Sequence, residues 1–284
     1  MDYLSPKLDI VFKKAFGDVN NADMLRGLVS AYLGVDTSGR FELSNTEITP
    51  EELERKFARL DLRISTENSE IDIEVQVVNR SDYMDRCLYY WASLYASMVP
   101  RSGKYISAKQ TLMLNILDFS WFKCDDFNTN FTFYDPKNKL TLSDKARISF
   151  IELPKIRSYT KEEVRRDERV AWAAFFNAKT KEEFDMLSNT TDNTNVQKAI
   201  TVIRQLSADE RVREEARKRE DALYSERSAL HSAKAEGIAA EQARMIANLR
   251  ELGVPENVIK LAASGKSIEE TEDNSDEEDM DFEP

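Results

Sequence analysis

Hydrophobic and polar residues alternate in two neighbouring segments of the chain. Apolar residues occupy every second position of residues 59–65 and again of residues 71–77. A period of two is typical of a β-strand with one buried face. Because a short polar connection, residues 66–70, joins the two segments, they are predicted to form a hairpin. Asp61 then lies on the non-core face of the first strand, and Glu74 and Gln76 lie on that of the second.

Apolar residues recur at helical spacing on both sides of this hairpin. Residues 5–17 are predicted to form a first helix, with Ser5 as N-cap and Gly17 at the C-terminal end. Residues 23–33, followed by Gly34, predict a second helix, and the aromatic-rich residues 82–98 predict a third. Three further strands are expected at 111–117, 131–134 and 148–153. The first 155 residues therefore read as a mixed α/β domain.

The composition changes after Pro154. Thr160, Thr180 and Ser207 each begin a capping-box pattern, which predicts that each opens a helical segment. The last segment continues to about Leu252 as a long solvated helix or coiled coil without a sustained heptad, and a short helix follows. The predicted division is a core at 1–155, a helical extension at 156–206, the long helix with its short helical end at 207–265, and a disordered acidic tail at 266–284.

Composition excludes several classes of function. The chain carries 40 basic and 52 acidic residues, but ten of the acids lie in residues 269–284. The formal charge of the remainder is −2, which neither demands nor forbids a nucleic-acid partner. A single histidine, two cysteines and eight scattered glycines exclude serine triads, cysteine–histidine dyads and glycine-rich phosphate loops. The sequence contains no long apolar run and no signal peptide at its start, so we expect a cytoplasmic protein without a membrane partner.

Carboxylates must then carry the chemistry. Asp61 and Glu74 converge from adjacent strands, and such a pair suits a hard divalent cation such as Mg²⁺. The backbone carbonyl of Val75 is a candidate further ligand. A cation held there lowers the pKa of bound water and stabilises charge on a phosphoryl oxygen. The alternative interpretation is that these are ordinary polar residues on the outer face of a hairpin.

Several motifs resemble one known family. The run SPKLDIVFKKAFG at 5–17 resembles the N-terminal signature of the Rpn family, and RLDLR at 59–63 and IDIEVQ at 71–76 resemble its Asp strand and its Glu-X-Gln strand. LYYW at 88–91, NILDF at 115–119 and LGVP at 252–255 match segments that normally follow. Rpn proteins are recombination-promoting nucleases, also described as transposases, of the PD-(D/E)XK superfamily. The resemblance covers roughly residues 1–265.

This resemblance implies a fold, an activity and a set of residues. The implied fold is a restriction-endonuclease-like α/β core, a mixed central sheet flanked by helices, followed by an all-α C-terminal region. The implied activity is Mg²⁺-dependent DNA endonuclease hydrolysis, with Mn²⁺ as a substitute, linked to DNA recombination and mobile DNA. Asp61 and Glu74 would be metal ligands, and Gln76 would occupy the place of the superfamily lysine. A neutral amide can orient water or donate hydrogen bonds but supplies no positive charge.

Other residues are candidates beside this site. Asp9 and Lys13, one helical turn apart, are either accessory to it or a surface pair. Three cations, Lys56, Arg59 and Arg63, could hold DNA phosphates or be solvated, and alternation places Arg63 on the face of Asp61. Asp72 shares the face of Glu74 and is expected at an exposed strand end, with tuning of the metal as the alternative. Aromatic residues at 89–95 are expected in the core, with base stacking as the alternative.

Two functions compete with one another. The first is a metal-dependent DNA endonuclease. The second is a catalytically weak or inactive nuclease fold that serves as a platform for oligomerisation or partner binding, with a homo-oligomer formed through the C-terminal helices. A coiled-coil scaffold without any site is a third interpretation. Metal binding and cleavage that depend on Asp61 and Glu74 distinguish the first function from the others.

Overall fold

The computed structural model describes residues 3–44, 62–98, 109–156 and 158–264. Lys56, Arg59 and Asp61, three of the predicted site residues, lie outside the described residues. The chain clusters into two units, Met1–Asp221 and Ala222–Pro284, and the first contains the sheet and the helices packed on it.

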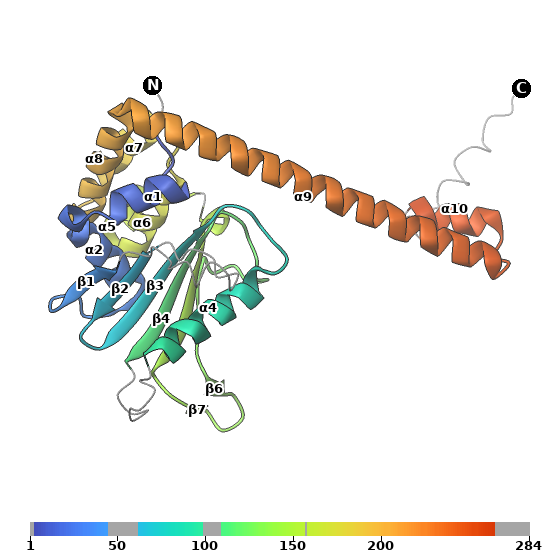
Figure 1. The fold of residues 1–284 in the computed structure, drawn as a ribbon, viewed down its shortest axis with the longest axis horizontal. Helices are drawn as coiled ribbons and strands as arrows, with labels where there is room; N and C mark the ends of the chain where they lie inside the picture. The colour runs from blue at the N-terminus through green and yellow to red at the C-terminus, as the bar shows by residue number, and fades with distance from the viewer. Residues whose placement is uncertain (1–2, 45–61, 99–108, 157, 265–284) are drawn as a thin grey trace, which may run out of the picture. The chain divides into compact units, whose positions relative to one another are not determined.

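A mixed six-stranded sheet forms the centre of the first unit (Figure 1). Its order is β1-β2-β3-β4-β8-β5, in which β3 pairs parallel with β4 and β4 parallel with β8, while the other neighbours are antiparallel. The strand bounds are β1 Phe41–Ser44, β2 Leu62–Thr66, β3 Ser69–Gln76, β4 Gln110–Leu117, β5 Asn128–Phe131 and β8 Ala146–Glu152. Two short strands, β6 Tyr134–Asp135 and β7 Leu140–Thr141, form a separate pair. The predicted strand 131–134 is therefore wrong, because β5 ends where it was expected to begin.

Strands β2 and β3 form the predicted antiparallel hairpin. Leu62 pairs with Ile73, and Ile64 pairs with Ile71. The turn is tighter than expected: only residues 67 and 68 separate the strands, and the Ser69 amide donates to the Thr66 hydroxyl at 2.9 Å. A shorter turn lengthens β3 at its N-terminal end, so Asp72 lies inside the strand.

One face of the sheet carries the apolar side chains of this hairpin and packs against helices. The helices that contact the strands are α1 Asp9–Phe16 and α2 Ala22–Leu33 (after the 3-10 turn η1 Val19–Asn21), and α6 Glu168–Asn177 and α8 Thr194–Ala208 pack with them. Their contacts centre on buried aromatic rings, including the pair Phe12 and Phe16 at 4.8 Å between centroids and the neighbouring Phe176 at 6.0 Å from Phe16. α1 begins at Asp9 and not at Ser5, whereas α2 ends at Gly34 as predicted, with a left-handed φ of 59°.

The other face of the sheet is covered by α4, Tyr83–Ser97, which confirms the predicted helix at 82–98. In Figure 1 this helix runs across the strands beside β4. Its sheet-facing side contributes Tyr83, Cys87 and Tyr90 to a buried cluster with Met113, Leu117 and Phe150. Tyr90 is thus a core residue, as expected, whereas Tyr89 is 47% exposed and does not fit that expectation. The face that carries the even-numbered residues of β3 is consequently enclosed by a helix.

The C-terminal region is helical, as predicted. After η3 Leu153–Lys155 its further helices are α5 Lys161–Arg166, α7 Lys181–Thr190, α9 Glu210–Glu251 and α10 Glu256–Ser264. Capping boxes at Thr160 and Thr180 are confirmed. The third prediction is wrong: Ser207 lies buried inside α8 and donates to the Ile203 carbonyl at 2.6 Å, while Asp209 accepts from the Arg211 amide at 2.8 Å and caps α9. Among the described helices, none combines the length and apolar character that crossing a bilayer requires.

Candidate active site

Two carboxylates of β3 are buried. Asp72 is 1% exposed and Glu74 is 2% exposed, and their spacing of two residues places both on the sheet face covered by α4. The interpretation of this stripe as a solvated outer face is therefore wrong, as is the expectation that Asp72 lies at an exposed strand end. Burying two acidic groups close together is costly unless cations or hydrogen-bond donors offset their charge. A pair of this kind is typical of a functional site.

Asn115 of β4 lies beside Glu74 in the parallel ladder and is itself buried. Its amide donates to the Ser149 carbonyl at 3.1 Å, and its side-chain oxygen accepts from the Tyr83 hydroxyl at 2.7 Å. The Cys87 thiol lies 3.7 Å from the same oxygen. This network fixes α4 over the carboxylates. Asn115 is the one polar residue in the otherwise apolar segment LMLNIL. That single polar position could have identified Asn115 as a site residue from the sequence.

Gln76, at the end of β3, holds Glu74 in position. Its side-chain nitrogen donates to a Glu74 carboxylate oxygen at 2.9 Å, and its backbone carbonyl accepts from the Asp118 amide at 2.9 Å. Asp118 in turn pairs with the buried Lys7 at 2.7 Å. The segment that precedes α1 is thereby anchored at the strand end beside Gln76. The sequence patterns did not single out Lys7, because its partner lies more than a hundred residues away.

Electrostatic effects connect α4 with both carboxylates. Burial raises the pKa of the Cys87 thiol to about 12, and the charges of Asp72 and Glu74 add to that increase. Burial also raises the pKa of Tyr90, with contributions from the same two charges. Burial opposes the charge of Arg86, but the hydrogen bond to Tyr90 and the charges of Asp82 and Glu74 outweigh it and raise the pKa of Arg86. Arg86 is therefore a cation within electrostatic range of Glu74, and it was not among the predicted residues.

Arg63 lies on the expected face of the sheet, since it pairs with Asp72 across the hairpin. Its guanidinium is bonded to Glu70 at 3.2 Å, and Glu70 also lies 3.4 Å from Lys109. Arg63 remains about one-third exposed, with 32% of its side chain accessible. The carboxylate of Glu70 thus fixes two cations at the N-terminal end of β3.

Asp9 and Lys13 lie on α1, the helix that packs on the apolar side of the hairpin, where Leu62 lies beside Gly17. Asp9 pairs with Arg219 of α9 at 2.8 Å. Among the described residues, no hydrogen bond or ion pair links Asp9 to Glu74 or Gln76, and its accessory role remains a prediction.

The donor chemistry of the site fits a hard divalent cation. Glu74 and Asp72 contribute carboxylate oxygens, Gln76 contributes an amide oxygen, and Val75 between them contributes a carbonyl. Within the described residues, no three acidic, histidine or cysteine side chains come together closely enough to hold a metal ion. Asp61, the carboxylate predicted to bind the metal together with Glu74, lies outside those residues. The described part of the site therefore supplies two carboxylates and neutral oxygens of the type that such a cation prefers.

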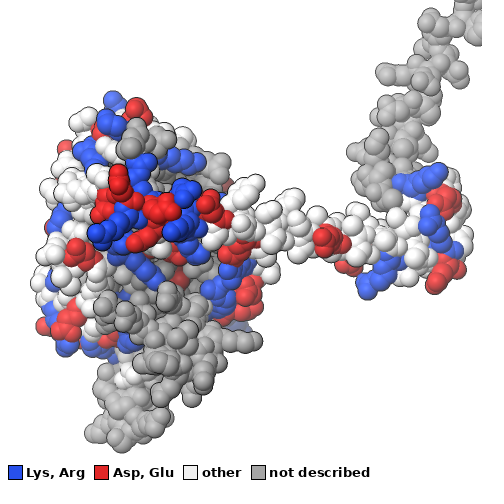
Figure 2. Space-filling view, turned by 45° about the horizontal axis from the view of Figure 1, so that its top comes forward, with Lys and Arg blue, Asp and Glu red and all other residues white. Residues whose placement is uncertain are grey.

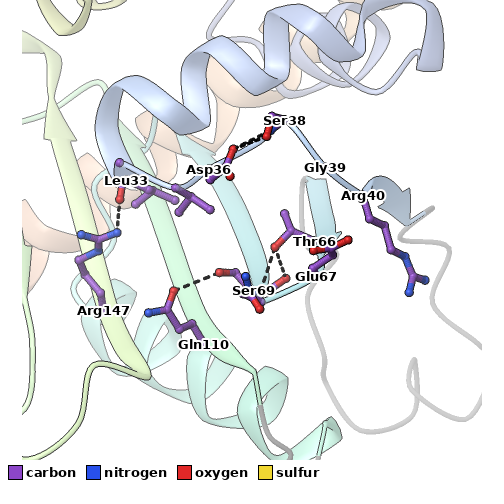
Figure 3. Close-up of a pocket in the computed structure, with 13 residues that line it drawn as sticks. Leu33, Asp36, Ser38, Gly39, Arg40, Thr66, Glu67, Ser69, Gln110 and Arg147 are labelled. Carbon is purple, nitrogen blue, oxygen red and sulfur yellow. Dashed lines mark hydrogen bonds between the residues drawn. The ribbon is translucent and has the colours of Figure 1, made fainter.

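A separate polar pocket of about 430 Å³ lies at the N-terminal end of β3 (Figure 3). The turn residues Glu67 and Asn68 line it together with Gly34 and Arg147, and Arg147 donates to the Leu33 carbonyl at the end of α2. None of its described lining residues is a predicted site residue. Since Glu74 and Gln76 lie at the other end of the same strand, this pocket and the carboxylate site are distinct.

Acidic and basic side chains alternate over the face shown in Figure 2. The first turns of α9 also carry ion pairs, of Glu214 with Arg217 at 3.0 Å and of Glu215 with Lys14 at 3.1 Å. Positive side chains there are matched by negative ones. The charge of this face therefore does not by itself favour a polyanion.

One of three comparisons with known proteins found a match. Neither the search of curated proteins nor the search of solved structures found a match. A family model described as PD-(D/E)XK nuclease family transposase matches residues 6–233, which include the sheet, α4 and the carboxylates of β3. Since that match spans most of the chain, and the mixed sheet with its helical C-terminal region has the expected fold, this chain belongs to the PD-(D/E)XK nuclease family transposases.

Proposed function

We propose that this protein is a metal-dependent DNA endonuclease whose active site is formed by Asp61, Glu74 and Gln76. Its family relates it to nucleases and to mobile DNA. The observation that carries the proposal is the nearly complete burial of two adjacent carboxylates, Asp72 and Glu74, on one strand of that fold. A protein retains such a costly arrangement where the charges are used.

The proposed metal ligands are Asp61, Glu74 and the Val75 carbonyl. Asp61 directly precedes Leu62 in the chain, and Glu74 directly follows Ile73, the ladder partner of Leu62. A bound divalent cation, Mg²⁺ or in its place Mn²⁺, supplies a more acidic water and compensates negative charge on the phosphate. These oxygen ligands suit either ion.

The side chains around the carboxylates position the reacting groups. Gln76 donates to Glu74 and so leaves the other carboxylate oxygen directed away from that bond. In hydrolysis the water oxygen forms a bond to phosphorus, and the bond from phosphorus to the 3′ oxygen breaks. The water loses a proton to solvent, and the 3′ oxygen gains one from solvent. Arg63, with Arg59 and Lys56, is proposed to hold flanking phosphates of the DNA.

Nicking of supercoiled plasmid tests this proposal. We expect nicking with Mg²⁺ or Mn²⁺, none with EDTA, and a decrease of at least about 10³-fold in Glu74→Gln and Asp61→Asn, because each removes a charged ligand. Glu162→Gln, on the exposed surface of α5, is the matched control and should cleave like the wild type.

Thermal unfolding separates catalysis from folding in the same variants. Glu74 is buried, so Glu74→Gln removes a desolvated charge and should leave the melting temperature unchanged or higher. An inactive variant that remains at least as stable as the wild type identifies Glu74 as functional. Wild-type protein that fails to nick DNA with either metal, or a Glu74→Gln variant that cleaves normally, would contradict the proposal.

A further inference from the structure

The strand that carries Glu74 supplies no positive charge to the site, because Gln76 is a neutral amide. We propose that Arg86 of α4 provides that charge and contacts the phosphate at which the DNA is cut. This inference rests on the proposed nuclease function and assigns a catalytic residue to it.

α4 directs Arg86 toward the carboxylate site. Tyr83, one turn before Arg86, donates to Asn115, the ladder neighbour of Glu74. Tyr90, one turn after it, is 6% exposed and belongs to the core cluster beneath the helix. Residues three and four apart share one side of a helix. Arg86 therefore lies between two side chains that contact the face of Glu74.

The guanidinium of Arg86 is held in place. Its Nε and one Nη donate to the Tyr90 hydroxyl at 3.3 and 3.2 Å, and its central carbon lies 5.7 Å from the centre of the Tyr90 ring. The charges of Glu74 and Asp72 also act on Tyr90. The Tyr90 hydroxyl thus fixes a cation that is itself only half-buried and accessible to a ligand.

Three other described cations near the strand are each paired with a carboxylate, which offsets part of their charge. Lys7 pairs with Asp118 at 2.7 Å, and Glu70 pairs with both Arg63 at 3.2 Å and Lys109 at 3.4 Å. Among the described ion pairs none includes Arg86, whose hydrogen bonds go to a neutral hydroxyl. A guanidinium has five N–H donors in a planar fork that matches phosphate. After its two bonds to Tyr90, three donors remain for that ligand.

The expected role follows from where charge develops during cleavage. Negative charge increases on the phosphate oxygens in the transition state, and a preorganised donor stabilises it without reorganisation. Removing one such donor typically lowers the rate about 10²–10³-fold. A lysine-bearing strand would provide this charge from position 76, whereas here it comes from the helix above the strand.

Four variants test the proposal: Arg86→Gln, Arg86→Lys, the double variant Arg86→Gln with Gln76→Lys, and Arg166→Gln on exposed α5 as control. We expect Arg86→Gln to lower cleavage about 10²-fold or more and Arg86→Lys to lower it less. The double variant restores a cation on the strand and should cleave at least about tenfold faster than Arg86→Gln alone. Arg166→Gln should match the wild type.

Binding of a DNA duplex in EDTA provides a readout that does not depend on cleavage. The slope of log binding constant against log salt concentration becomes shallower by about one for each phosphate contact that is lost. Arg86→Gln should therefore bind DNA more weakly and show this shallower slope. Wild-type cleavage and an unchanged salt slope in Arg86→Gln would overturn the proposal. If the wild type does not cleave at all, the nuclease function fails, and the binding slopes alone decide whether Arg86 contacts phosphate.

Discussion

At the scale of single residues, the environment of Cys87 reports on the buried carboxylates. Its thiol lies 3.4 Å from the Met113 sulfur and beside Asn115, and burial together with Asp72 and Glu74 raises its pKa to about 12. Because the thiolate is the reactive form, only about one molecule in 10⁴ is reactive at this position at pH 8. Cys124 is exposed.

We therefore expect one thiol of the native protein to react with an aromatic disulfide reagent at pH 8, and two to react after unfolding in guanidinium. The absorbance of the released chromophore, measured under both conditions, gives the number of thiols that react per chain. In Cys124→Ser the native count should fall to zero. Rapid reaction of both thiols in the native wild type would show that the cluster beneath α4 opens readily, contrary to this expectation.

The same shift has a defined sign in the pH dependence of stability. The folded state holds the Cys87 proton more tightly than the unfolded chain, whose thiol has its ordinary pKa of 9.0. The contribution of this group is therefore fully present below pH 9 and is lost as pH rises from 9 toward 12, at up to about 1.4 kcal/mol per pH unit. Cys87→Ala should flatten that part of the curve.

At the scale of elements, one close approach joins the N-terminal helices to the helical extension. Gly27 of α2 lies so near Asn195, at the start of α8, that a Cβ added to Gly27 would come within 2.8 Å of the Asn195 Cβ. Backbone-proximal atoms cannot move as side-chain ends do. The extension is thus packed on the same helices that cover the sheet.

Two glycine-to-alanine substitutions should consequently differ in effect. Gly27→Ala forces α2 and α8 apart and should lower the free energy of unfolding by about 1–3 kcal/mol. Gly237→Ala in α9, where a Cβ would meet nothing within 4 Å, should not lower it, since alanine favours a helix by up to about 1 kcal/mol. Far-UV circular dichroism during thermal unfolding measures both. Equal decreases in melting temperature would contradict the packing argument.

Local sequence patterns predicted some elements correctly and others not. The hairpin and α4 were predictable because period-two and helical spacing are properties of contiguous residues. The burial of Glu74 was not, because the covering residues Tyr83 and Asn115 come from later elements. The start of α9 was misplaced because Ser207 and Asp209 both satisfy a local capping pattern, and only the packing of α8 decides between them.

The candidate site was predictable to the same extent. Alternation placed Glu74 and Gln76 on one face, and the hydrogen bond between them agrees with that placement. Arg86 gave no signal in its own segment, because a single arginine on an aromatic-rich helix is ordinary. Its relation to Glu74 depends on how α4 crosses the sheet. The roles of Asp61, Lys56 and Arg59 remain predictions.

At the scale of the whole molecule, α9 exposes large apolar side chains in a stretch rich in alanine. Leu230, Ile238 and Met245 are 41%, 51% and 45% exposed and are spaced eight and seven residues apart. At about 100° per residue, Ile238 and Met245 lie about 80° and 60° around the helix from Leu230, so the three side chains form a stripe within one quarter of the circumference. Helices with such a stripe can pair. We expect the full chain to form a homo-oligomer through this stripe.

Sedimentation of the full chain measures that association. Leu230→Lys together with Met245→Lys should reduce the mass in solution to that of a single chain, because each places a charge in the stripe. Ser232→Lys adds the same charge on a different side of the helix and should leave the mass unchanged. A wild type that sediments as a single chain would exclude association through α9.

The parallel pairing of β3 with β4 also determines when the site can exist during synthesis. Hairpin contacts between β2 and β3 need only neighbouring residues, but β4 starts at Gln110, beyond the whole of α4. Strand pairs between distant residues form late in folding, and the N-terminal part of the chain leaves the ribosome first during synthesis. When only the hairpin of a nascent chain has left the ribosome, Glu74 is exposed to water, without Asn115 or Arg86 beside it. The site can assemble only after α4 and β4 have been translated. Chains that end before β4 therefore lack the arrangement of Glu74 with Asn115 and Arg86.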